Sequence, residues 1–112
     1  MRDEGVYLAH ILECIRRIEV LTLEGRETFM TSFLHQDAIL RNLQTMSEST
    51  QRLSSEAKGL HPEVEWRKIS AFRNVLTHDY LGVNLRLVWE IIQRDVPQLK
   101  RAAEALAQEH GR

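Results

Sequence analysis

The sequence predicts an all-α protein, an antiparallel four-helix bundle with an extra short C-terminal helix, in a single domain over residues 1–112. Along most of the chain, apolar residues recur at steps of three and four, which is the period of an amphipathic helix. No stretch shows the strict alternation of apolar and polar residues that is typical of a half-buried strand. Glycines and prolines interrupt the helical pattern at a few points, and these breaks separate the predicted helices.

The N-terminal half of the chain predicts two long helices. Gly25 is expected to end the first helix. The second helix is expected to begin at Thr31 or Ser32, which are both good N-cap residues, and to run to about Ser54. The apolar stripe of the first helix contains Leu8, Ile11, Leu12, Ile15 and Ile18, and that of the second contains Ile39, Leu43, Met46 and Leu53.

The C-terminal half predicts two further helices and a short one. Pro62 suits the first turn of the third helix. This helix should end around residues 78–81, before Asn84, which is a suitable N-cap for the fourth helix. Pro97 is expected to break the fourth helix and to start a fifth, Ala-rich helix that ends near Gln108. The expected inward-facing residues are Trp66, Ile69, Phe72 and Leu76 on the third helix and Leu85, Val88, Trp89, Ile91 and Ile92 on the fourth.

The composition is that of a folded globular protein, with 43% hydrophobic and 28% charged residues. No apolar run approaches the ~20 residues of a membrane-spanning helix, and the first residues lack the pattern of a signal peptide. A single cysteine, Cys14, excludes an internal disulfide and a cysteine-rich zinc site. Four of the five histidines are scattered without ligand spacing. We therefore expect a cytoplasmic protein with no metal, no cofactor and no membrane contact.

The formal net charge of −1 bears on nucleic-acid binding. A protein that binds nucleic acid through its overall charge is usually basic. Contacts to RNA would therefore have to come from a local cluster of cations. The candidates for such a cluster are Arg67, Lys68, Arg73 and Arg86.

The most informative stretch is an Arg-x4-His-x-Tyr motif at the end of the third predicted helix. It reads Arg73, Asn74, Val75, Leu76, Thr77, His78, Asp79 and Tyr80. Arginine is a permanent cation whose planar fork matches phosphate oxygens, and histidine moves protons near neutral pH. RNA carries its own nucleophile, the 2′-hydroxyl, so a metal-free enzyme needs only proton transfer and charge stabilisation. The motif is therefore a candidate for metal-independent phosphodiester cleavage.

The spacing of the motif raises a geometric problem. Arg73 and His78 are five positions apart, which is about 140° around an α-helix. On one straight helix the two side chains would not converge on the same phosphate. Either the helix ends before His78 and the chain turns back, or two subunits share the site across a two-fold axis. We favour a homodimer, with both effects open, and a dimer would also double the local positive charge.

Purely structural roles are open for every member of the motif. Arg73 could pair with Glu48 or Asp79. Tyr80 could be a core ring whose hydroxyl bonds to the backbone, and Asn74 could tie two helices together. Both tryptophans lie in apolar periodic stretches, so we expect them in the core and not as stacking platforms for bases.

The motif and its surroundings resemble the HEPN superfamily, specifically its HepT-like (DUF86) branch, over nearly the whole chain. One residue departs from the pattern, because Ser47, beside Glu48, stands where many relatives carry glycine. In the N-terminal half the resemblance rests on residues 36–43 and Glu48. In the C-terminal half it rests on Trp66, Ile69, Arg73, Asn74, His78, Asp79, Tyr80, Gly82, Asn84, Val88, Trp89, Asp95 and Pro97.

The resemblance implies an all-helical, homodimeric ribonuclease toxin, usually encoded beside a minimal nucleotidyltransferase (MNT) antitoxin, with the paired motifs lining a cleft. Carried over to this sequence, Arg73 and His78 would be the nuclease pair. Asn74 would support the site, and Asp79, next to His78, is a second candidate for that role. Tyr80 matches the motif tyrosine to which, in some members, the antitoxin attaches AMP and so silences the toxin.

Three interpretations follow from these residues. The first is a metal-independent endoribonuclease toxin, in which His78 transfers a proton and Arg73 clamps the phosphate, leaving a cyclic phosphate. The second is a non-catalytic helical adaptor, or nucleotide-binding partner, of a nucleotidyltransferase. The third is a dimeric scaffold in which the motif only packs.

Overall fold

The computed structural model describes residues 4–78 and 84–110, with residues 73–78 described as helical backbone only. The described residues form helices and no strand, so the predicted all-α class is confirmed. No helix among them is both long and apolar enough to cross a membrane. The helices are α1 (Gly5–Leu21), α2 (Arg26–Thr31), α3 (Phe33–Thr50), α4 (Ser55–Gly59), α5 (Trp66–His78) and α6 (Leu85–His110).

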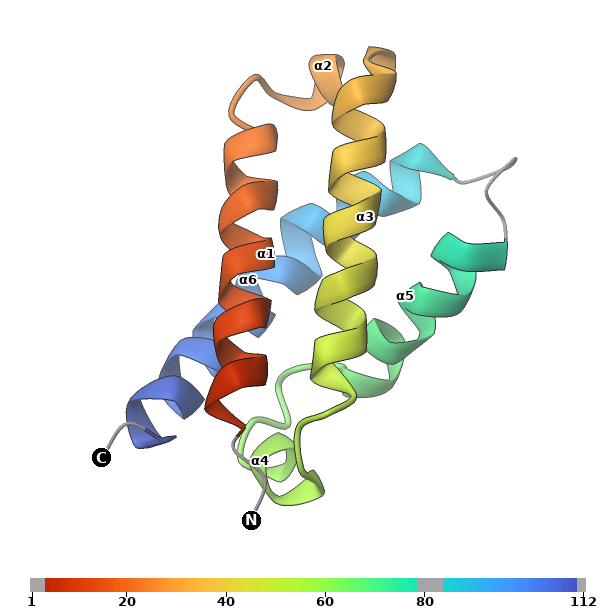
Figure 1. The fold of residues 1–112 in the computed structure, drawn as a ribbon. Coiled ribbons are helices and arrows are strands. Elements are labelled where there is room, and N and C mark those ends of the chain that lie inside the picture. Colours follow the sequence, from red (N-terminus) through yellow and green to blue (C-terminus); the bar gives the residue numbers. More distant parts are fainter. Residues whose placement is uncertain (1–3, 79–83, 111–112) are drawn as a thin grey trace.

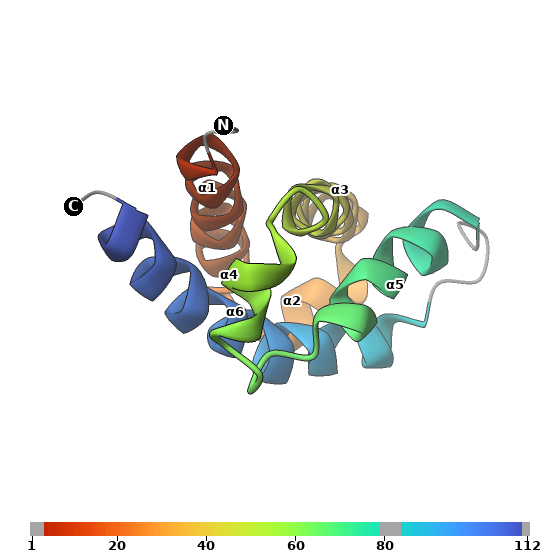
Figure 2. The same ribbon diagram turned by 90° about the horizontal axis from the view of Figure 1, so that it is seen from below.

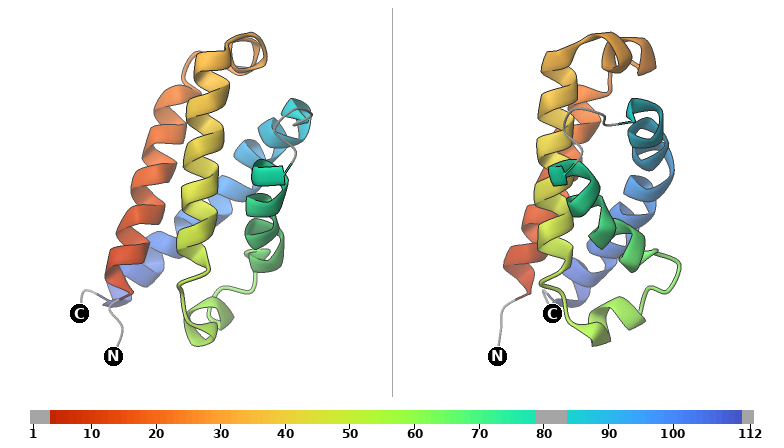
Figure 3. Two further views of the ribbon diagram at one scale, coloured as in Figure 1. Left: turned by 45° about the vertical axis from the view of Figure 1, so that its right-hand side comes forward. Right: turned by 90° about the vertical axis from the view of Figure 1, so that its right-hand side faces the viewer.

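The four long helices form an up-and-down bundle. α1 and α3 lie side by side in opposite directions, and α5 packs along α3 on the side away from α1 (Figure 1). Seen from below, α6 runs across one face of the α1–α3 pair and packs on α1 (Figure 2). Two further views place α5 and α6 on the same side of this pair (Figure 3). The short helices α2 and α4 lie at opposite ends of the bundle.

One hydrophobic core joins the long helices. The stripes predicted for the first two long helices are buried in it, apart from Leu12, which is partly buried against it. The ring of Phe29, on α2, stacks on that of Trp89, on α6, with centroids 5.6 Å apart. The core residues shared by α1, α3 and α6 include Ile11, Ile15, Ile18, Ile39, Leu43, Met46, Val88, Val96 and Leu99.

Two predicted helix boundaries are wrong in the N-terminal part. Ser32 caps α3 as expected, accepting a hydrogen bond from the backbone N–H of His35. The helix ends at Thr50, however, and Ser54 is the N-cap of α4, where its hydroxyl accepts a hydrogen bond from the backbone N–H of Ala57. Gly25, with φ of 90°, precedes the unpredicted helix α2. Serine serves equally well at an N-cap and in a turn, so its presence alone did not distinguish these alternatives.

The third long helix begins later than Pro62 suggested. Residues 61–64 form a turn in which the N–H of Val64 bonds to the carbonyl oxygen of His61. This turn buries Val64 in the core, and α5 starts only at Trp66. Pro62 therefore belongs to the turn and not to the helix.

Pro97 does not break the last helix, so the separate short C-terminal helix is wrong. α6 continues from Leu85 to His110 with Pro97 inside it. An internal proline costs ~3 kcal/mol because it removes one backbone hydrogen bond and crowds the preceding turn. Here the buried face keeps its register across the proline, so its burial offsets that cost. The face consists of Val88, Ile91, Ile92, Asp95, Val96, Leu99, Ala102, Ala103 and Leu106.

We expect Leu99→Ala to lower the free energy of unfolding by about 2–5 kcal/mol, because Leu99 is 0% exposed and its removal leaves a cavity. The matched control is Leu87→Ala on the same helix, where the side chain is 41% exposed and the loss should be about 1 kcal/mol or less. Urea unfolding followed by circular dichroism measures both. Equal losses would contradict a core that continues beyond Pro97.

Candidate functional site

The motif lies on the last two turns of α5 and in the segment that follows. Arg73, Asn74 and His78 belong to the helical backbone of α5, and their side chains lie outside the described part of the structure. Asp79 and Tyr80 also lie outside the described residues. The predicted end of this helix at residues 78–81 agrees with the bounds of α5.

Because α5 runs through His78, the alternative in which the helix ends before the histidine is wrong. The backbone positions of Arg73 and His78 are thus about 140° apart around one helix axis. α5 also ends at the edge of the bundle, on the side away from α1 (Figure 1).

Three side chains hold α5 in place. Ile69 and Phe72 are core residues, and α5 packs on α3. The indole N–H of Trp66 donates to the carbonyl oxygens of Lys58 and His61, each at 3.0 Å. These bonds anchor the first turn of α5 to the preceding segment. Both tryptophans pack against the core, as expected from the sequence.

The cations proposed to contact RNA differ in their surroundings. Arg67 and Arg86 are exposed and form no hydrogen bond or ion pair with the described residues. Lys68 Nζ lies 3.0 Å from Oδ2 of Asp95, on α6, and 3.8 Å from Glu65 Oε2. Asp95 is only 3% exposed, so the ammonium of Lys68 compensates a buried carboxylate.

Sequence reasoning missed this role of Asp95, although a signal was present. Asp95 occupies an inward position in an otherwise apolar stripe, between Ile91 and Leu99. A carboxylate at such a position needs a partner, because burying an unpaired charge is costly. The pattern therefore called for a cation on a neighbouring helix.

Ser47 is fully buried at the point where the family pattern has glycine. Its hydroxyl donates to the carbonyl oxygen of Leu43, at 2.8 Å on the same helix. The backbone carbonyl oxygen of Ser47 accepts a hydrogen bond from the hydroxyl of Thr50 at 2.7 Å. The serine is thus accommodated in the packed interior without an unsatisfied polar atom.

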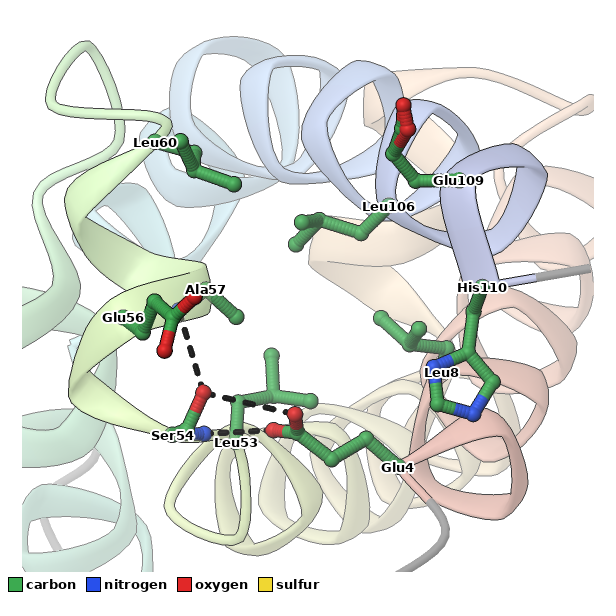
Figure 4. Close-up of a pocket in the computed structure, with 10 residues that line it drawn as sticks. All are labelled: Glu4, Leu8, Leu53, Ser54, Glu56, Ala57, Leu60, Leu106, Glu109 and His110. Carbon is green, nitrogen blue, oxygen red and sulfur yellow. Dashed lines mark hydrogen bonds between the residues drawn. The ribbon is translucent and has the colours of Figure 1, made fainter. Parts of the chain in front are cut away.

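A separate hollow of about 420 Å³ lies at the end of the bundle where α1, α4 and the last turns of α6 meet (Figure 4). Its floor includes Leu8, Leu53 and Leu106. Its rim carries the carboxylates Glu4, Glu56 and Glu109, of which Glu4 accepts hydrogen bonds from the backbone and hydroxyl of Ser54. Such a rim repels phosphate, so this hollow does not suit RNA.

The described residues show neither a metal-binding cluster nor a reactive cysteine. No group of three or more His, Cys, Asp or Glu residues is arranged to hold a metal ion there. Burial raises the pKa of the Cys14 thiol, which therefore stays protonated at neutral pH and is a poor nucleophile.

Comparison with known proteins identifies the family. The model of the family described as "Ribonuclease HepT-like" matches residues 11–106. The chain belongs to this HepT-like family. A Thermococcus cleftensis protein, named as a candidate ribonuclease HepT, is 37% identical over 106 residues, covering 94% of this chain and 96% of its own. A Caldanaerobacter subterraneus protein, named as a candidate RNase, is 33% identical over 109 residues, covering 96% and 97%.

Another relative of this HepT-like chain is much longer. A Methanocaldococcus jannaschii protein, named as a gamma-glutamylcyclotransferase and candidate RNase, is 36% identical over 100 residues. The match covers 88% of this chain but spans only 45% of that relative. No solved structure gives a significant match. The family name and these relatives support a ribonuclease-type function for the HepT-like chain.

We expect Trp66→Phe to destabilise the protein by about 1–2 kcal/mol more than Trp89→Phe. Both changes shrink a partly buried aromatic ring, but only the first removes an indole donor that serves two backbone carbonyls. Thermal unfolding of the two variants gives the comparison. Equal losses would mean that the bonds of Trp66 do not anchor α5.

Proposed function

We propose that this protein is a metal-independent endoribonuclease toxin that acts as a homodimer and is silenced by AMP attached to Tyr80. One observation carries the proposal: a chain of the HepT-like ribonuclease family has an Arg-x4-His-x-Tyr motif whose arginine and histidine lie on the last turns of α5. The motif supplies a cation for phosphate and a group for proton transfer, which together suffice for cleavage through the 2′-hydroxyl of RNA.

In the proposed reaction, His78 moves a proton, either from the 2′-hydroxyl or to the leaving 5′-oxygen. The 2′-oxygen attacks the adjacent phosphorus, the bond to the 5′-oxygen breaks, and a 2′,3′-cyclic phosphate and a free 5′-hydroxyl result. Arg73 stabilises the negative charge that builds on the phosphate oxygens. Asn74 and Asp79 support this pair, and Arg67 and Arg86 bind neighbouring phosphates along the RNA.

A dimer would bring together an arginine and a histidine that one helix holds apart. With α5 helical through His78, one chain presents Arg73 and His78 about 140° apart. A two-fold axis beside the end of α5 brings the arginine of one copy toward the histidine of the other. Each dimer then contains two composite sites, and neither copy alone is active.

The control step follows from the same position. Tyr80 is two residues beyond His78, so an AMP group on its hydroxyl adds bulk and negative charge beside the catalytic pair. Both effects exclude RNA. The donor would be a nucleotidyltransferase antitoxin of the MNT type, which transfers AMP from a nucleoside triphosphate and releases pyrophosphate.

We expect Arg73→Ala and His78→Ala each to abolish cleavage of RNA in chelator. An equimolar mixture, refolded together, should recover about a quarter of the wild-type rate, because half of the dimers are mixed and each mixed dimer keeps one intact composite site. A mixture as inactive as its components would contradict a shared site. Equal cleavage by wild type and both variants would remove the nuclease assignment.

We expect coexpression with a neighbouring nucleotidyltransferase to raise the mass of the protein by multiples of an AMP unit and to abolish RNA cleavage. Tyr80→Phe should keep the unmodified mass and stay active under the same conditions, because it lacks only the acceptor hydroxyl. Tyr7→Phe, on α1, is the matched control and should still be modified. Intact-protein mass spectrometry measures all three. Modification of Tyr80→Phe would place the acceptor elsewhere.

A further inference from the structure

The ion pair between α5 and α6 has features that stability alone does not explain. Asp95 is 3% exposed, and its Oδ2 atom accepts no hydrogen bond from any described residue. The nearest cation is Lys68, whose Nζ lies 3.0 Å from that oxygen as an ion pair without hydrogen-bond geometry. An apolar pair at such a position is often as stable or more stable.

This ion pair is also the one that connects α5 to α6 within the described parts of the chain. The core contacts of α5 are made mainly with α3, whereas α6 packs on α1. Apolar contacts hold α5 against α3, and the charge pair of Lys68 and Asp95 adds a link from α5 to α6.

From these observations we infer that Asp95 is a positioning residue for the motif helix and acts through Lys68. Lys68 lies in the first turn of α5, about 7.5 Å along the axis from position 73 and about 15 Å from position 78. A small rotation or shift of α5 at this point displaces both positions. Misplacement of reacting groups by 1 Å can cost about a hundredfold in rate.

The inference rests on the proposed function for its kinetic test and competes with one other role for Lys68. If Lys68 instead bound RNA, its removal would raise KM and weaken the salt dependence of binding, while removal of Asp95 would not. If the pair positions α5, both removals lower kcat and leave KM and the salt dependence unchanged. The two roles therefore predict different kinetics.

The experiment compares Asp95→Asn, Lys68→Met and the double variant on RNA in chelator, at a temperature where all are folded. Each single change should lower kcat about ten- to a hundredfold and change KM by no more than about twofold. The kcat of the double variant should be no lower than that of the less active single variant. Losses in kcat that multiply in the double variant would overturn the inference, and so would a rise in KM confined to Lys68→Met. Should Lys68→Met fail to fold, the kcat values of Asp95→Asn and of the double variant still test the inference, since neither variant buries an unpaired charge.

Two controls separate positioning from general loosening. Glu65→Gln removes only the exposed partner of Lys68 and should leave kcat unchanged. Leu106→Ala destabilises α6 in the core, far along the helix from Asp95, and should lower Tm without lowering kcat. A loss of kcat in Leu106→Ala as large as that in Asp95→Asn would overturn the inference.

A readout without RNA keeps the inference testable apart from the nuclease assignment. In Asp95→Asn, hydrogen exchange of the α5 amides should accelerate about tenfold or more, while exchange in α3 stays unchanged. If the wild type cleaves no RNA, the proposed function fails and this exchange experiment decides the inference alone. Unchanged exchange in α5 would overturn it.

Discussion

The buried face of α6 is the constraint on which the rest of the bundle depends. This helix of 26 residues carries Val88, Val96 and Leu99 into the core against α1, and its Trp89 ring stacks on Phe29. The same face presents Asp95 to α5. Because the face is continuous, the helix tolerates Pro97 in its interior. A break at the proline would have separated the part of α6 that packs near α2 from the part that packs near α4.

The second constraint is the helical geometry of α5, because it sets where the positions of the motif lie around the helix axis. A five-residue spacing on a helix that continues through His78 separates two positions by about 140°. Within one chain, this spacing keeps an arginine and a histidine apart. In the proposed homodimer, a two-fold axis would bring the arginine of one copy toward the histidine of the other. The position of α5 at the edge of the bundle is consistent with such an axis (Figure 1).

Periodicity predicted the long helices well because each carries a clear apolar stripe, as Ile11, Ile39 and Leu99 illustrate. The boundaries were harder, because Ser54 and Pro62 each suit more than one local structure. At Pro62, burial of Val64 accompanies a turn in place of a helix start. Pro97 misled for the same reason: local propensity favours a break, and burial of residues on both sides outweighs it. For the site, the motif predicted the candidate catalytic residues. The role of Asp95 became visible only once the structure placed Lys68 of α5 beside it.

The distribution of charge indicates which part of the proposed nuclease would face RNA. With a net charge of −1, the chain as a whole does not attract RNA. Acidic groups rim the hollow at the end where α1 and α4 meet. Exposed Arg67 lies on α5, which carries part of the motif, and exposed Arg86 lies on α6. The charge of Lys68 is directed to Asp95, so it adds little to this positive surface. Among the described residues, few of the cations predicted to contact RNA are thus left unpaired, and the proposed homodimer would bring a second set to the same place.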